Sequence, residues 1–109
     1  MSDRILPNLG FEGLVASTTV SRRALVEPAF RAWVTQRVYR HLCCDWGDVS
    51  PAMQDANFAS VVLGGPVLSR WPFESDALVI LHTADQAQAT VMLESERPET
   101  YSGPTFQEV

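Results

Sequence analysis

The chain of 109 residues contains no lysine, and its eight Lys-or-Arg positions are all arginine. It has two cysteines, Cys43 and Cys44, and a disulfide between adjacent residues closes almost no loop and is strained. No apolar run approaches the roughly 18 residues of a membrane-spanning helix, and the N-terminal residues lack the basic start and apolar stretch of an export signal. We therefore expect a reduced, cytoplasmic chain with no membrane contact.

Charge is distributed unevenly along the sequence. Residues 1–41 hold six arginines against three carboxylates, whereas residues 42–109 hold two arginines against ten carboxylates. Repulsion by phosphates makes the acidic part unsuited to direct nucleic-acid binding. The same charge favours docking onto a basic surface of another protein. We therefore expect a partner protein with a basic surface and no direct contact with nucleic acid.

The residue pattern predicts an α+β domain with an N-terminal strand, two helices and then a three-stranded antiparallel meander. Ser50 followed by Pro51 is typical of a helix start, and Gly64 of a helix end. Ser21 is a candidate cap for a first turn ahead of the helix that contains Pro28. The predicted helices span residues 28–42 and 51–62, and the predicted strands span residues 13–20, 67–73, 77–83 and 89–93.

The domain organisation follows from the same pattern. We expect a flexible lead-in over residues 1–12, one domain over 13–96 and an extended or mobile tail over 97–109. Pro72 cannot donate to a strand ladder, so its strand is predicted to lie at an edge or to end there. The run 78–81 is apolar on both faces, which indicates a central strand covered by helices on one side and by something else, such as a second copy, on the other.

Two polar side chains fall on the apolar face of the helix predicted over residues 28–42. They are Arg37 and His41, and burial of an unpaired charge is costly. Carboxylates from elsewhere are one solution, with Asp45, Asp48 and Asp85 as the nearest candidates. A snorkelling arginine and a histidine satisfied at the helix end are the other.

Several residues have side chains of the types found in metal or nucleophile sites. His41, Cys43, Cys44 and His82 lack the separated ligand pairs of zinc sites. A triad of Cys44, His41 and Asp45 would be almost consecutive, whereas catalytic triads converge from distant segments. Glycine-rich phosphate and dinucleotide motifs are absent. We expect neither a metal nor a cofactor.

The sequence Asp45-Trp46-Gly47-Asp48 allows two interpretations. In a scaffold, the tryptophan fills the core, the glycine makes a turn and the aspartates cap or pair. In an enzyme, paired carboxylates bind Mg²⁺ for hydrolysis of a phosphodiester, although the missing lysine weighs against a nuclease. The catalytic set of that alternative is His41, Asp45, Asp48, Asn57 and Asp85.

From Gly13 to Glu96 the chain resembles a family of small proteins from bacterial genomes, plasmids and phages. Members are catalogued as plasmid-related proteins or as type I restriction endonuclease subunit M. The residues that carry the resemblance are His41, Asp45, Trp46, Gly47, Asp48 and Asn57, and weaker matches are Val15-Ala16, Gly64, Leu68-Ser69, Ala84-Asp85 and Thr90. This chain departs from the pattern at Cys44, where glycine is common, and at Met53, where the family has an acidic residue.

The resemblance implies a protein of a mobile genetic element, and the lost charged positions make an enzyme less favoured here. Our preferred hypothesis is a non-enzymatic acidic protein that binds and inhibits a host DNA-processing or defence complex, such as CRISPR or restriction. Its predicted docking residues are Glu74, Asp76, Asp85, Glu94, Glu96 and Glu99. A metal-dependent hydrolase or nuclease and a homo-oligomeric structural or regulatory protein are the alternatives.

Overall fold

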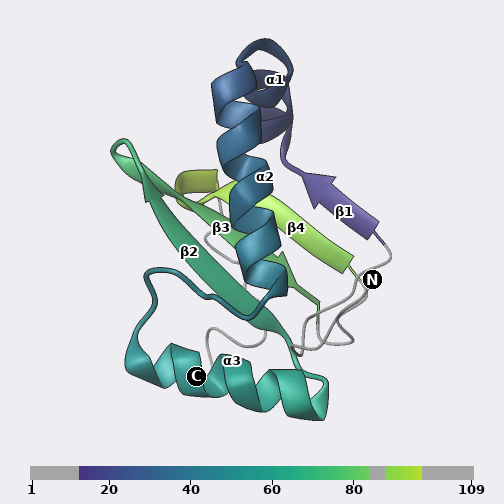
Figure 1. The fold of residues 1–109 in the computed structure, drawn as a ribbon, viewed down its shortest axis with the longest axis vertical. Coiled ribbons are helices and arrows are strands. Elements are labelled where there is room, and N and C mark those ends of the chain that lie inside the picture. Colours follow the sequence, from purple (N-terminus) through teal and green to yellow (C-terminus); the bar gives the residue numbers. More distant parts are fainter. Residues whose placement is uncertain (1–12, 84–87, 97–109) are drawn as a thin grey trace.

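The computed structural model of the chain describes residues 13–83 and 88–96 (Figure 1). The lead-in predicted over 1–12 and the tail predicted over 97–109 lie outside these residues. The described elements are β1 (Gly13–Ala16), α1 (Thr18–Val26), α2 (Pro28–Leu42), α3 (Pro51–Leu63), β2 (Val67–Phe73), β3 (Asp76–His82), β4 (Gln88–Leu93) and the 3₁₀ turn η1 (Glu94–Glu96). The α+β class is confirmed, as are both predicted helices and the last three strands within one residue or so.

The sheet is mixed rather than purely antiparallel. The predicted antiparallel meander accounts for β2, β3 and β4, and β1 is added in parallel. The strand order of the sheet is β1-β4-β3-β2. Strand β1 pairs with β4 in parallel, whereas β2, β3 and β4 pair as antiparallel neighbours. The sheet therefore has four strands, with β3 and β4 central and β2 at one edge. The edge position predicted from Pro72 is confirmed.

The N-terminal strand is shorter than predicted, because the chain turns into a helix at Ser17. The Ser17 hydroxyl accepts a hydrogen bond from the Val20 amide at 3.2 Å and caps α1. The same hydroxyl donates to Glu96 at 2.8 Å, which joins the start of α1 to η1. Thus Ser17, rather than Ser21, is the cap, and residues 18–20 are helical although two threonines and a valine favour a strand.

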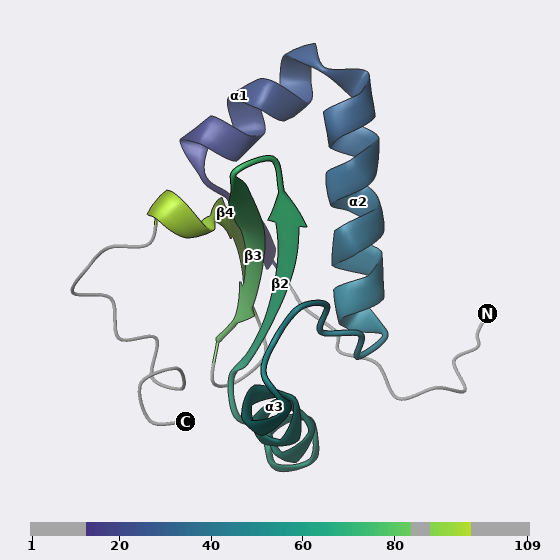
Figure 2. The ribbon, with the colours of Figure 1, turned by 90° about the vertical axis from the view of Figure 1, so that its left-hand side faces the viewer.

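Helix α2 lies along one face of the sheet and α1 crosses the upper end of the sheet, as Figure 2 shows edge-on. Both helices contribute to the core on that face. The core between them contains Phe30 from α2 and Trp71, Leu78, Ile80 and Val91 from three strands. These strand residues share one face because side chains alternate along a strand.

The opposite face of the sheet is apolar as well. It presents Leu68, Val79 and Leu81, packed with Val49 and Met92. Helix α3 lies across the end of β2 rather than over either face of the sheet (Figure 2). The central strand β3 is therefore buried on both faces, as its apolar run predicts. None of the helices in the described ranges has the length and apolar character to cross a bilayer.

The capping role of Ser17 can be tested against Ser21. Ser17→Ala removes both the cap and the bond to Glu96, so we expect the free energy of unfolding to fall by about 1–2 kcal/mol. Ser21→Ala is the control, because that hydroxyl makes a single long bond of 3.4 Å to the Ala16 carbonyl. Urea denaturation measures both, and an equal loss in the two variants would contradict the assignment.

Candidate functional site

The motif residues lie beside strand β2 in space, although none of them is adjacent to β2 in the sequence. On the outer edge of β2, the Arg70 amide donates to the Trp46 carbonyl at 3.1 Å and the Arg70 carbonyl accepts from the Asp48 amide at 2.7 Å. Between these residues, Gly47 forms a parallel bridge with Arg70. The segment 46–48 therefore acts as a very short fifth strand beside β2.

Asn57 extends this contact by one step along β2. Its side-chain amide donates to the Leu68 carbonyl at 2.8 Å and accepts from the Leu68 amide at 3.1 Å, and the side chain is fully buried. In an antiparallel edge strand, alternate residues point their backbone groups outward. In β2 these are Leu68, Arg70 and Pro72. Asn57 and segment 46–48 bond the first two, and Pro72 has no N–H to bond.

Gly47 makes this close approach sterically feasible. It has a φ of 69°, in the left-handed region that favours glycine. A Cβ at this position would collide with the Arg70 carbonyl oxygen and would lie 2.9 Å from the Trp71 ring. Its amide donates a hydrogen bond to the Asp45 carboxylate at 3.1 Å, and this bond stabilises the turn. The glycine and first aspartate of the motif thus shape the loop.

His41 enters the same region from the other side, at the end of α2. Its Nδ1 lies 2.7 Å from the Ser69 hydroxyl, and its Nε2 lies 2.7 Å from Nδ1 of His82 on β3. Both imidazole rings are fully buried and parallel within 2°. Trp46 packs edge-on against His41 with ring centroids 5.6 Å apart. The motif histidine therefore ties α2 to β2 and β3 inside the core.

One arrangement of protons accounts for all the contacts in this chain of groups. Trp71 Nε1 donates to the Ser69 hydroxyl at 2.9 Å, because an indole nitrogen cannot accept. We infer that the Ser69 proton then points to His41 Nδ1, so that His41 carries its proton on Nε2 and donates it to His82 Nδ1. Every hydrogen in these contacts then has an acceptor, with both rings neutral.

Burial keeps His41 neutral. Desolvation, followed by the neighbouring His82, lowers the pKa of His41 to about 3. A neutral ring, enclosed on every side, has no access to a substrate. The geometry suits a structural role better than acid–base chemistry.

Two arrangements were predicted for Arg37 and His41 on the apolar face of α2, and neither matches the structure fully. Arg37 places its guanidinium 4.7 Å from the Trp33 ring centre and 5.7 Å from that of Trp71. These cation–π contacts replace the carboxylate partners that the sequence suggested. His41 likewise meets Ser69 and His82 instead of an aspartate. The interpretation of a satisfied histidine at the helix end is the closer one.

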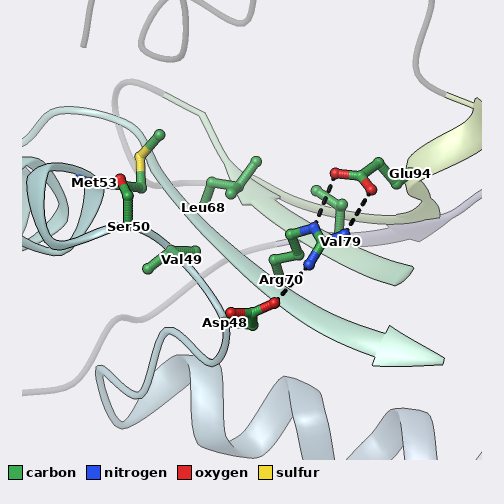
Figure 3. A pocket seen from close by; sticks show the side chains of 8 residues that line it. All are labelled: Asp48, Val49, Ser50, Met53, Leu68, Arg70, Val79 and Glu94. Carbon is green, nitrogen blue, oxygen red and sulfur yellow. Dashed lines mark hydrogen bonds and ion pairs between the residues drawn. The ribbon is translucent and has the colours of Figure 1, made fainter. Parts of the chain in front are cut away.

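On the face of the sheet opposite α2, the charged side chains of Asp48, Arg70 and Glu94 border a pocket (Figure 3). Arg70 donates through Nε and Nη2 to Glu94, both at 3.0 Å, and through Nη1 to Asp48 at 2.7 Å. The Glu94 carboxylate is the main cause that raises the pKa of Arg70. The pocket has a volume of about 200 Å³ and also contacts Val49, Ser50, Met53, Leu68 and Val79.

The proposed catalytic residues are thus placed in three different environments. His41 and Asn57 are buried in separate hydrogen-bond networks, Asp48 pairs with Arg70 at the pocket, and Asp45 caps the Gly47 turn. Asp85 lies outside the described residues. Within the described ranges, no three side chains of His, Cys, Asp or Glu are close enough to hold one metal ion.

The cysteines do not resemble activated nucleophiles. Burial raises the pKa of the Cys44 thiol, with a smaller contribution from Cys43, whereas a reactive thiol needs a lowered pKa. Cys44 has a φ of 65°. This is the left-handed region, which favours glycine, so the cysteine adopts it with some backbone strain.

The predicted set omitted the β2 residues that receive the motif, namely Ser69, Arg70 and Trp71. One signal was available in the sequence. Ser69 stands between Val67 and Trp71 on the inner face of β2, and a buried hydroxyl in an apolar row calls for a polar partner.

Comparison of the chain with models of known protein families, with curated proteins and with solved structures found no match in any of the three.

The close approach of Gly47 to β2 predicts an unequal cost of two glycine substitutions. Gly47→Ala combines a strained backbone with a collision, so we expect it to lower the free energy of unfolding by at least about 2 kcal/mol. Gly64→Ala is the matched control, because Gly64 has a φ of 88° but open space around a Cβ. It should cost about 1 kcal/mol. Similar losses in urea denaturation would show that segment 46–48 does not pack closely on β2.

The buried histidine predicts a characteristic pH dependence. In the unfolded chain His41 binds a proton below its ordinary pKa of about 6.5, whereas folded His41 stays neutral down to about pH 3. Stability is therefore greatest above pH 6.5 and falls as the pH drops, with a slope approaching about 1.4 kcal/mol per pH unit.

The window between pH 6 and 5 separates the effect of the buried histidines from that of the carboxylates, whose lowered pKa values act at lower pH. Chemical denaturation at each pH gives the slope. His41→Gln should be less stable at neutral pH and should have a shallower slope in this window. An unchanged slope would mean that His41 does not account for the acid sensitivity.

Proposed function

We propose that the chain is a non-enzymatic interaction protein, which docks its acidic side onto a basic surface of a cytoplasmic protein complex. The target class follows from the resemblance to plasmid and phage proteins: a host DNA-processing or defence complex, such as CRISPR or restriction, which the protein inhibits. The observation that carries the docking proposal is the separation of charge between residues 18–42 and the described residues that follow them.

Residues 18–42, which form α1, α2 and the turn between them, carry five arginines and one glutamate. Residues 43–83 and 88–96 carry seven carboxylates and one arginine. Helix α2 lies along one face of the sheet and α1 crosses its upper end (Figure 2), whereas the acidic residues belong to the loop before α3, α3, the turn between β2 and β3, β3 and η1. Segregated charge of this kind orients an approaching partner and accelerates its association.

The predicted docking carboxylates divide into two groups. Glu74 pairs with Arg23 at 2.9 Å, and Glu94 pairs with Arg70 at 3.0 Å, so arginines of the same chain offset these two charges. Asp85 and Glu99 lie outside the described residues.

Within the described ranges, Asp76 and Glu96 have no arginine in contact with their carboxylates. Asp76 accepts hydrogen bonds from Ser95, which lower the pKa of its carboxyl group. Glu96 is partly desolvated, which raises its pKa, but bonds led by that from the Leu93 amide outweigh this and lower it. Both carboxylates are ionised at neutral pH and are held rigidly. They are the part of the predicted set best suited to meet a basic partner.

The placement of the motif favours this proposal over a hydrolase or nuclease. A catalytic centre needs its groups in one accessible cleft, and here His41 and Asn57 are buried in separate hydrogen-bond networks. The homo-oligomeric alternative has one observation in its favour: Val62 and Leu63 at the end of α3 are 80% and 82% exposed.

An affinity purification of the tagged protein from the organism that carries the gene tests the proposal. The acidic variant Asp76→Asn with Glu96→Gln keeps one acceptor oxygen in each side chain and removes two charges. We expect a stoichiometric partner, at least tenfold less of it with the acidic variant, and weaker binding as salt increases.

The control variant is Arg22→Gln with Arg40→Gln, which removes two exposed charges from the basic residues 18–42. It should retain the partner. The proposal fails if no stoichiometric partner is recovered, or if the acidic and basic variants bind it as well as the unaltered protein does.

A further inference from the structure

Beside the charged group on β2, the pocket combines an apolar floor with a negative border. Leu68 and Val79 come from the face of the sheet opposite α2, where they are 5% and 1% exposed, and Met53 comes from α3. Figure 3 shows Met53 and Leu68 on one side of Arg70, with Asp48 and Glu94 on either side of its guanidinium. The apolar floor and the carboxylates thus belong to one concave surface.

Three charged side chains among the described residues line this border. Arg70 bonds both carboxylates, Asp48 and Glu94, and these three side chains together carry one positive and two negative charges. Asp48 is 64% exposed through its side chain, and only its Oδ2 accepts from Arg70. Within the described residues no hydrogen bond to its Oδ1 is formed. An anion would be repelled here, and a cation can reach Asp48 from solvent.

The size of the pocket limits what it holds. Sites for complete small molecules usually measure at least about 300 Å³, whereas this pocket has about 200 Å³. One long side chain fits that space better than a drug-sized ligand does. Arginine and lysine join an apolar stem to a cationic head, and arginine in particular is enriched among residues that anchor protein interfaces.

We propose that this pocket receives an arginine side chain of a partner protein, with its stem beside Leu68, Val79 and Met53 and its guanidinium at the exposed carboxylate of Asp48. The inference rests on the proposed docking function and specifies the contact by which the acidic side recognises a basic surface. Because the pocket lies beside segment 46–48, the motif positions one carboxylate of the anchor site. The second aspartate of the motif then has a binding role in addition to its backbone bond to β2.

The test is a titration of the isotopically labelled full chain with N-acetyl-argininamide, followed by the backbone amide NMR signals. We expect millimolar binding, with the largest shifts at Val49, Met53, Leu68, Arg70, Val79 and Glu94. N-acetyl-citrullinamide, which has the same shape without the charge, should shift these signals much less.

Two variants locate the binding. Asp48→Asn should weaken the affinity about threefold or more, since an exposed ion pair contributes modestly. Asp55→Asn removes the same charge from an exposed position on α3 that does not border the pocket, and it should leave the affinity unchanged. Equal effects of the two variants, equal binding of citrullinamide, or saturable binding of inorganic phosphate would overturn the proposal.

Further outcomes separate this inference from the proposed function. Pocket signals that change with protein concentration, without added ligand, would assign the surface to a second copy and overturn the proposal. A purified partner that binds the Asp48→Asn variant with full affinity would also overturn it, while the docking function stands. Site-specific argininamide binding without a cellular partner would support the pocket and count against the docking function.

Discussion

The outer edge of β2 imposes the constraint around which the rest of the structure is arranged. An edge strand exposes unpaired backbone groups, which invite pairing with other chains. Here Asn57 bonds Leu68, segment 46–48 bonds Arg70, and Pro72 presents no N–H. The inner face of the same strand receives His41 through Ser69. The most distinctive residues of the sequence therefore hold β2 from two directions. The proposed docking surface and the proposed arginine pocket depend on the position of that strand.

Local signals in the sequence were sufficient for most of the secondary structure. Proline at the first turn of α2 and α3, a serine cap at Ser50 and the glycine at position 64 mark helix ends with clear physical causes. The N-terminal region was different, because β-branched residues 18–20 favour a strand while the Ser17 cap starts a helix. The parallel pairing of β1 with β4 joins residues more than 70 positions apart, and no local pattern encodes it.

The candidate site shows the same division. Sequence composition singled out His41, segment 45–48 and Asn57, but it could not show that their partners are Ser69, Arg70 and Leu68. Such partners are set by the packing of α2 and α3 against β2, which is a long-range property. The acidic surface was visible as net charge, whereas the pairing of Glu74 and Glu94 with arginines required three-dimensional coordinates. Side chains that looked catalytic in the sequence mostly form hydrogen bonds within the protein.

Amide hydrogen exchange at β2 tests most directly whether the motif closes this edge. The amides of Leu68 and Arg70 point away from β3, so protection can come only from Asn57 and the Trp46 carbonyl. The account predicts that both exchange as slowly as the amides of the β2–β3 ladder, through the same cooperative opening. Rapid exchange at these two positions, with the ladder amides still protected, would contradict it and show an open edge.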